Sequence, residues 1–172
     1  MSKSVDSQVA KSSFSGHYQL ELRRVDGTVE FFEDDNLIVD EGLNSILNTE
    51  LGGATAKPTW YLGVFEGNYT PLAAVTAATI TAASTESTAY AAATRVEWVE
   101  VASTAKSITN SASRASFVFN ATKTIYGAFL VSESAKSAVT GTLFSALRFA
   151  NAKAVESGDE LLITYTVTAA SA

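Results

Sequence analysis

Alternating apolar and polar residues predict β-strands at both ends of the chain. In residues 17–25 and 160–168 apolar side chains recur at every second position, as in strands that turn one face to a core. In the last strand this inward set is Leu161, Ile163, Tyr165 and Val167. Asp26-Gly27 separates the first strand from residues 28–39, and such a pair supplies the positive φ angles of a type I′ turn. The opening region is therefore predicted to be a hairpin.

A helical period follows the hairpin. Asp40 can cap a helix there, and Glu41 is favourable in its first turn because a helix N-terminus attracts negative charge. Gly52-Gly53 ends it. The apolar stripe of this helix consists of Leu43, Ile46, Leu47 and Leu51. We therefore expect one short helix near residues 40–51.

The rest of the chain is predicted to be mostly β. Strands are expected at 59–65, 94–101, 115–121, 124–132, 142–150 and 159–168, separated by turn-forming residues. Alternation places Val96 and Trp98 on the same face of the strand at 94–101. It likewise places Phe117 and Phe119 on the same face of the strand at 115–121. Residues 72–93 combine alanine with threonine, and we interpret them as an extended surface segment. The fold class is all-β, an antiparallel β-sandwich of about eight strands, with jelly-roll and immunoglobulin-like strand orders both open.

Composition indicates one folded domain. Of 172 residues, 47% are apolar and 17% charged, which is typical of a chain that builds a core. Residues 1–15 are Ser-rich without periodicity, so we expect a flexible arm at 1–15 and a single β-sandwich domain at 16–172. The first residues lack the apolar run of a secretion signal, and the most apolar stretch is too short to span a membrane. A soluble protein made in a cytoplasm is expected.

Charge and residue types exclude several kinds of chemistry. A net charge of −6 with scattered Lys and Arg argues against nucleic-acid binding. Cysteine is absent, and the single histidine, His17, has no nucleophile or acid at a motif spacing. Glu97 and Glu100 flank Trp98, but on a strand they point to opposite faces and cannot converge on a glycosidic bond. We expect no enzymatic activity, no catalytic residues, no cofactor and no metal.

The acidic stretch at residues 30–41 is the candidate cation site of the sequence. Its carboxylates are the ligands that Ca²⁺ prefers, but the spaced ligand loop of an EF-hand is missing. A solvated hairpin end followed by a helix cap is the favoured interpretation, and cation binding stays open.

Four aromatic residues gather around one predicted strand and the loop after it: Trp60, Tyr61, Phe65 and Tyr69. Alternation places Trp60 with Leu62 and Val64, and Tyr61 with Phe65 on the opposite face. Both faces of this strand should then be covered. Packing in the core is favoured, a subunit contact comes next, and sugar stacking is a further alternative.

Three blocks of the sequence resemble small structural proteins of tailed bacteriophages. These blocks are NLIVDEGLNSIL at 36–47, WYLGVFEGNYTP at 60–71, and the closing strands between Ile125 and Val167. In that group a helix of the form N-L-[IV]-x-x-x-G-L-N-x-[IL] precedes a Tyr-Leu-x-[VL] strand. A strand of the form G-D-x-L-x-[IV]-T-[YW] closes the domain. The resemblance covers Asn36 to about Ala169 and involves structural residues rather than a catalytic signature.

Members of this group resemble capsid cement (decoration) proteins or domains of tails and tail fibres. The tail-fibre versions follow a longer fibre, whereas here a short arm and one hairpin precede the motif, which favours cement. The resemblance implies a virion location, with the major capsid protein and copies of the chain as partners, and no nucleic acid, membrane or small-molecule ligand. The alternative is a tail component that contacts a host-surface glycan. The candidate interaction surface comprises Ser2, Lys3, Val5, Val9, Phe14, Trp60, Tyr61, Phe65 and Tyr69.

Overall fold

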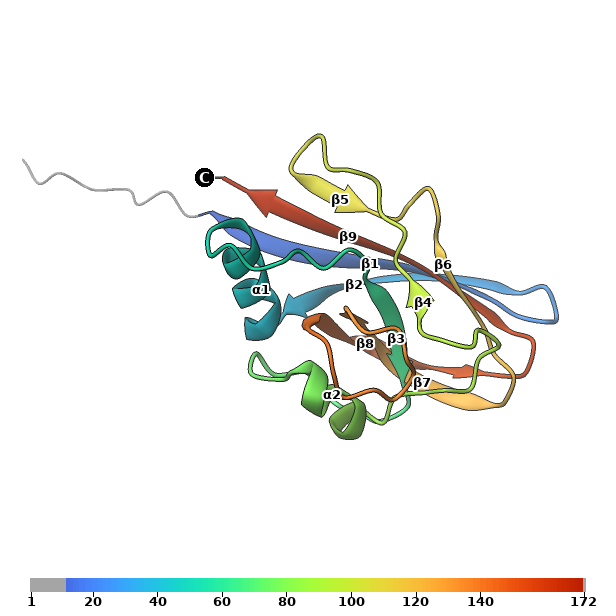
Figure 1. The fold of residues 1–172 in the computed structure, drawn as a ribbon. Helices are drawn as coiled ribbons and strands as arrows, with labels where there is room; N and C mark the ends of the chain where they lie inside the picture. The colour runs from blue at the N-terminus through green and yellow to red at the C-terminus, as the bar shows by residue number, and fades with distance from the viewer. Residues whose placement is uncertain (1–11, 172) are drawn as a thin grey trace, which may run out of the picture.

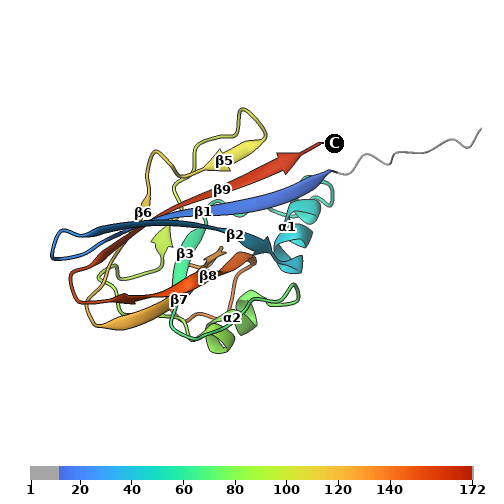
Figure 2. The ribbon, with the colours of Figure 1, turned by 180° about the vertical axis from the view of Figure 1, so that it is seen from behind.

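The computed structural model describes residues 12–171, which form one antiparallel sheet that curls until its halves face each other (Figures 1 and 2). Its strands are β1 (Ser13–Arg23), β2 (Val29–Ile38), β3 (Tyr61–Phe65), β4 (Val96–Glu97), β5 (Ser107–Thr109), β6 (Ala115–Val118), β7 (Lys123–Val131), β8 (Leu143–Val155) and β9 (Glu160–Ala170). Two helices, α1 (Asp40–Glu50) and α2 (Ala77–Ser84), accompany the sheet. The all-β prediction and the helix near 40–51 are confirmed.

The structure gives the strand order, which alternation alone does not encode. This order runs β4-β3-β7-β8-β2-β1-β9-β5, and β6 also pairs with β9. One layer contains β1, β2 and β9, and the other contains β3, β7 and β8 (Figure 1). The layers are continuous because the end of β2 joins the second one, where Leu37 pairs with Ala146 and Ile38 with Ser145.

The main core lies between the two layers. The predicted inward residues of β9 are all buried there, and so are Phe117 and Phe119. Within this core the rings of Tyr18 and Tyr165 stack with centroids 4.2 Å apart. Period-two alternation thus identified the inner face of these strands correctly.

A second core lies on the outer side of β3, β7 and β8, under α2. It includes Phe65, Ile80, Phe129 and Leu143. Both faces of β3 are therefore covered, as its pattern predicted: Leu62 and Val64 face the main core, and Phe65 faces α2.

The expectation of an extended segment over residues 72–93 is wrong, because α2 forms within it. Thr76 and Thr79 make a capping box in which each side chain contacts the other residue's backbone. The alanines between them have the highest helix propensity, and Ile80 anchors the helix in the second core. The threonines that suggested strand or loop are used to begin the helix.

The first hairpin also turns differently from the type I′ prediction. Gly27 has a positive φ of 88°, but Asp26 does not. Gly27 N donates to Arg24 O at 3.0 Å, and Arg24 N donates to Thr28 O at 2.8 Å. This is the pattern of a three-residue loop with Gly in the left-handed position. Asp26 instead accepts a hydrogen bond from Thr28 N through its side chain.

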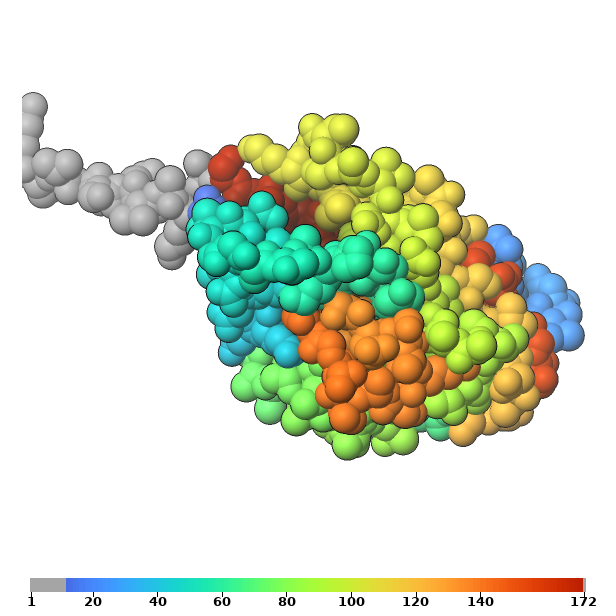
Figure 3. All heavy atoms as spheres, in the orientation of Figure 1, coloured from blue at the N-terminus to red at the C-terminus, as the bar shows by residue number. Residues whose placement is uncertain are grey.

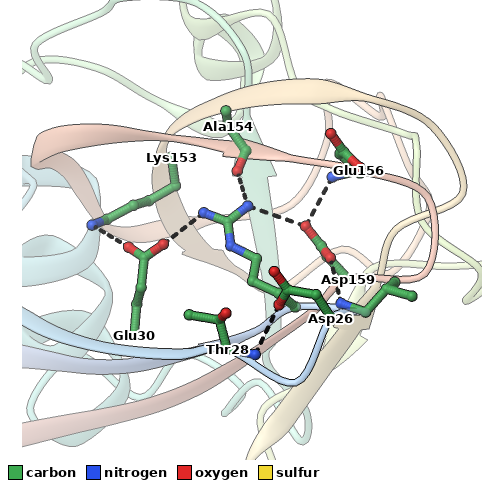
Figure 4. A network of polar contacts seen from close by, with 9 residues as sticks. Asp26, Thr28, Glu30, Lys153, Ala154, Glu156 and Asp159 are labelled. Atoms are coloured by element: carbon green, nitrogen blue, oxygen red, sulfur yellow. Dashed lines mark hydrogen bonds and ion pairs between the residues drawn. The ribbon is translucent and has the colours of Figure 1, made fainter.

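Polar contacts hold this hairpin to the β8–β9 turn (Figure 4). Arg24 pairs with Glu30 at 2.7 Å and with Asp159 at 3.1 Å. Burial alone would raise the pKa of Asp159, but hydrogen bonds from the backbones of Glu156 and Val25 and from Arg24 lower it overall. The carboxylate therefore stays charged and ties together two turns that are distant in sequence.

The two ends of the described chain lie side by side at the opposite end of the sheet, next to α1 (Figure 1). β1 begins at Ser13, which pairs with Ala170 of β9. Residues 13–15 of the expected arm therefore belong to the sheet, and residues 1–11 lie outside the described part of the chain.

Candidate functional site

An apolar cleft of about 390 Å³ opens at the α1 end of the molecule. In Figure 3 it appears as a hollow between α1 with the segment that follows it and the yellow residues around β5, with red β9 at its floor. Its aromatic lining consists of Phe14, Trp60, Trp98 and Phe144, and its main aliphatic residues are Ile46, Ile108, Leu130 and Val167. The cleft is the open end of the main core.

Both tryptophans of the protein line this cleft. The indole of Trp60 packs edge-to-face on Phe144, with ring centroids 5.5 Å apart. Trp98 is buried, and its Nε1 donates a hydrogen bond to the backbone oxygen of Tyr165 at 3.1 Å. Because that hydrogen bond fixes Trp98, the more accessible Trp60 and Phe14 are better placed to contact an incoming group.

Helix α1 forms one wall of the cleft. Its close packing against the sheet depends on Gly42. A Cβ at this position would lie 2.3 Å from the backbone oxygen of Phe144, so the helix approaches the sheet with no side chain between them. Ile46, about one turn further along, then lies in the cleft wall. The rest of the predicted apolar stripe faces outward: Leu43, Leu47 and Leu51 are 37%, 54% and 84% exposed.

Charged groups lie at the rim of the cleft. Glu50 comes from the last turn of α1 and Lys57 from the segment that follows. Within residues 12–171 neither side chain makes an ion pair. An apolar interior with charges outside suits the binding of an apolar group from a larger partner, because hydrophobic contact area provides the affinity.

The structure brings together two residues of the candidate interaction surface and separates three others. Phe14 and Trp60 both line the cleft. Phe65 is fully buried in the second core, where Tyr69 also packs, so neither is part of the cleft surface. Tyr61 pairs with Val131, which belongs to that second core, and thus lies across β3 from Trp60. The remaining candidates, Ser2, Lys3, Val5 and Val9, lie outside the described residues.

Sequence reasoning missed Trp98, Phe144, Ile46 and Ile108 as parts of a site. Alternation placed Trp98 on the inner face of its strand, and helical periodicity placed Ile46 on the apolar stripe. Neither pattern indicates where a core reaches solvent. That information comes only from the pairing of β5 with β9 and from the close approach of α1.

The acidic stretch at 30–41 does not converge on one point. Glu30 pairs with Arg24 and Lys153, and Asp34 accepts a hydrogen bond from Ala150 N. Asp35 points to the other face of β2, where its Oδ1 lies 2.8 Å from Nδ1 of His17. Over the described residues there is no group of three or more His, Cys, Asp or Glu side chains that could hold a metal ion.

A buried ion pair joins two long loops on the α2 side of the sheet. Arg95 and Glu86 form two hydrogen bonds, at 2.8 and 2.7 Å, and their side chains are 0% and 1% exposed. Arg95 also donates to the backbone oxygens of Glu133 and Ala138, and Glu86 accepts from Ser137 N. All these partners are within the protein, so the polar atoms of the pair are engaged in contacts within the fold.

Fold and cleft together define the class: an all-β domain with an apolar cleft at one end of a curled sheet. No family model, curated protein or solved structure matches this chain.

Neither helix in the described part of the chain has the length and apolar character needed to cross a membrane.

Proposed function

We propose that this protein is a non-enzymatic structural component of a tailed-phage particle, a capsid cement protein that binds the head shell and copies of itself. The sequence resemblance over residues 36–169 supports the assignment of the protein to a tailed-phage particle. The observation that carries the binding role is the apolar cleft, in which Trp60 and Phe14 present aromatic surface between charged residues of the rim. Aromatic side chains in such a setting are typical of the central contacts of protein interfaces.

The ion pairs that charged side chains form within the fold support an architectural role. Arg95 and Glu86 join the loops beside α2, while Arg24 and Asp159 join the turns at the far end. These groups are engaged in contacts within the fold instead of facing the cleft. The cleft therefore offers hydrophobic contact and shape, which are what assembly with the shell and with other copies of the chain needs.

The direct test is binding to shells. Purified protein is mixed with mature, expanded phage heads that lack it, and we expect co-sedimentation and increased resistance of the heads to heat or chelator. Thr49→Arg, which places a long charged side chain on the cleft wall, should weaken binding at least about tenfold, because a buried charge without a partner is costly. Asn151→Arg, at an exposed position of β8, is the matched control and should bind normally.

A protein that sediments free of heads, and is absent from purified particles, would contradict the proposal. The number of copies per particle separates shell from tail, because hundreds imply the shell and six to a few dozen imply the tail.

The alternative, a tail component that contacts a host glycan, has one supporting observation, the partly exposed indole of Trp60 in the cleft. Indole rings stack on sugars as they do on other flat apolar surfaces. A glycan array in which wild type binds and Trp60→Ala does not would favour this alternative. Density on the icosahedral face of the head, together with an array without signal, would rule it out.

A further inference from the structure

We infer that the cleft is the receptor for residues 1–11 of a second copy of this chain. The inference rests on the proposed binding role and names the partner. It starts from the place where those residues join the described fold. Ser12 leads into β1, and Phe14, two residues later, is part of the cleft lining. The segment and the cleft therefore meet at the same end of the molecule.

The sequence of the segment suits an apolar cleft with a polar rim. Met1, Val5 and Val9 are four residues apart, so in an extended chain all three fall on one face. Lys3 and Ser7 lie between them on this same face, and the opposite face carries Ser2, Ser4, Asp6 and Gln8. The three apolar side chains can thus enter the cleft with Lys3 and Ser7 directed to its polar rim, while the opposite face stays in water.

The direction of β1 favours insertion of the segment into the cleft of a second copy over insertion into the cleft of its own molecule. β1 starts at the cleft end and runs toward the far hairpin (Figure 1). If the strand were continued backwards from Phe14 in extended form, Val9 would lie about 17 Å beyond Phe14, at 3.3 Å per residue. A return to its own cleft needs a reversal within residues 9–12, whose sequence Val-Ala-Lys-Ser contains no Gly, Pro, Asn or Asp.

The exposed apolar residues on the outer face of α1 also favour a second copy of the chain as the partner. Leu43 and Leu47 lie on the helix that forms the cleft wall, Leu51 directly follows it, and their exposure makes an apolar strip beside the cleft. A second copy whose segment enters the cleft lies next to this strip and can cover it. Two copies that exchange segments reciprocally form a closed dimer, so both clefts are filled at once.

Sedimentation velocity and tryptophan emission test the inference on the full chain. We expect the wild type to dimerise as concentration rises, with a blue shift of the emission, because the partly exposed Trp60 lines the cleft and loses water when the cleft fills. Val5→Asp/Val9→Asp should raise the dimer dissociation constant at least about 100-fold, since two carboxylates would enter apolar surroundings. Ser4→Asp/Gln8→Asp adds the same charge on the opposite face of the segment and should dimerise as the wild type does.

Mixing two defective variants identifies which chain supplies the segment. Thr49→Arg has a blocked cleft but an intact segment, whereas Val5→Asp/Val9→Asp has an intact cleft. Neither should dimerise alone, but together they can form one intact insertion, and we expect a mixed dimer with partial recovery of the blue shift.

Three results would overturn the inference: a wild type that stays monomeric, a mixture that recovers nothing, or an emission change independent of protein concentration. The last would mean that each segment enters its own cleft. These measurements use no phage heads, so they can fail while shell binding holds, and shell binding can fail while exchange holds.

Discussion

The side-chain amide of Asn110 hydrogen-bonds the backbone on both sides of Thr164 as a neighbouring strand would. Its Oδ1 accepts from Tyr165 N at 2.7 Å, and its Nδ2 donates to Ile163 O at 3.1 Å. The residue is buried between β5, which pairs with β9 from Thr166 onward, and β6, which pairs with β9 up to Ile163. One amide therefore fills the gap between two short strands on the same edge of β9.

Removing this amide should destabilise the fold. Asn110→Ala leaves a buried N–H and a buried C=O of β9 without partners, and we expect a loss of about 2–4 kcal/mol in the free energy of unfolding. Urea denaturation followed by tryptophan emission measures it. Asn151→Ala, at an exposed position, should change stability by less than about 0.5 kcal/mol. Equal stability of the two variants would mean that the amide contacts contribute nothing.

The buried pair of Glu86 and Arg95 should be sensitive to the loss of one partner. Glu86→Gln leaves the Arg95 guanidinium buried without its counter-ion, and we expect a loss of about 3–5 kcal/mol. The double variant Glu86→Leu/Arg95→Met removes both charges and should be more stable than Glu86→Gln. Thermal unfolding of the three proteins checks this order. A double variant that is the least stable would show that the ion pair itself stabilises the loops.

His17 makes stability depend on pH in a predictable direction. Its contact with Asp35, aided by Glu33, raises its pKa above the ordinary 6.5. A raised pKa in the folded state stabilises the fold below the unfolded pKa, and this contribution is lost as pH rises through the folded pKa. Because His17 is the chain's one histidine, its NMR titration can be followed directly. Asp35→Asn should lower the measured pKa, and an unchanged value would contradict the assigned cause.

Gly42 should resist replacement even though alanine is the better helix former. Gly42→Ala would normally stabilise a helix by about 1 kcal/mol. Here the new methyl group meets the Phe144 backbone, so we expect α1 to shift, with a net loss of stability. Because Phe144 packs on Trp60, the tryptophan emission should change as well. Asn44→Ala, on the exposed side of the same helix, is the control and should raise stability slightly.

The sequence was informative wherever burial follows a simple period. In β9, Leu161 and Ile163 could be assigned to the core because each strand residue has only two faces to choose from. The pattern was misleading at α1, where Leu47 belongs to a helical stripe yet faces solvent. The determining fact there is the close contact between Gly42 and Phe144, which joins residues about a hundred positions apart.

The cleft could not be derived from local patterns for a related reason. Phe14, Trp60 and Trp98 come from three separate parts of the chain, and each is an ordinary inward residue of its own segment. A site emerges only because β4, β5 and α1 stop short of closing that end of the core. The lengths of these elements depend on which strands pair and how the helix packs. The period of apolar residues along the sequence does not specify either.

The pairing of Ser13 with Ala170 has a practical consequence for engineering. Both backbone ends leave the body at one pole, whereas the loop around Gly27 occupies the opposite pole (Figure 2). A foreign epitope grafted into that loop would project away from the cleft. The domain could then serve as a display scaffold whose cleft and cargo do not compete for space.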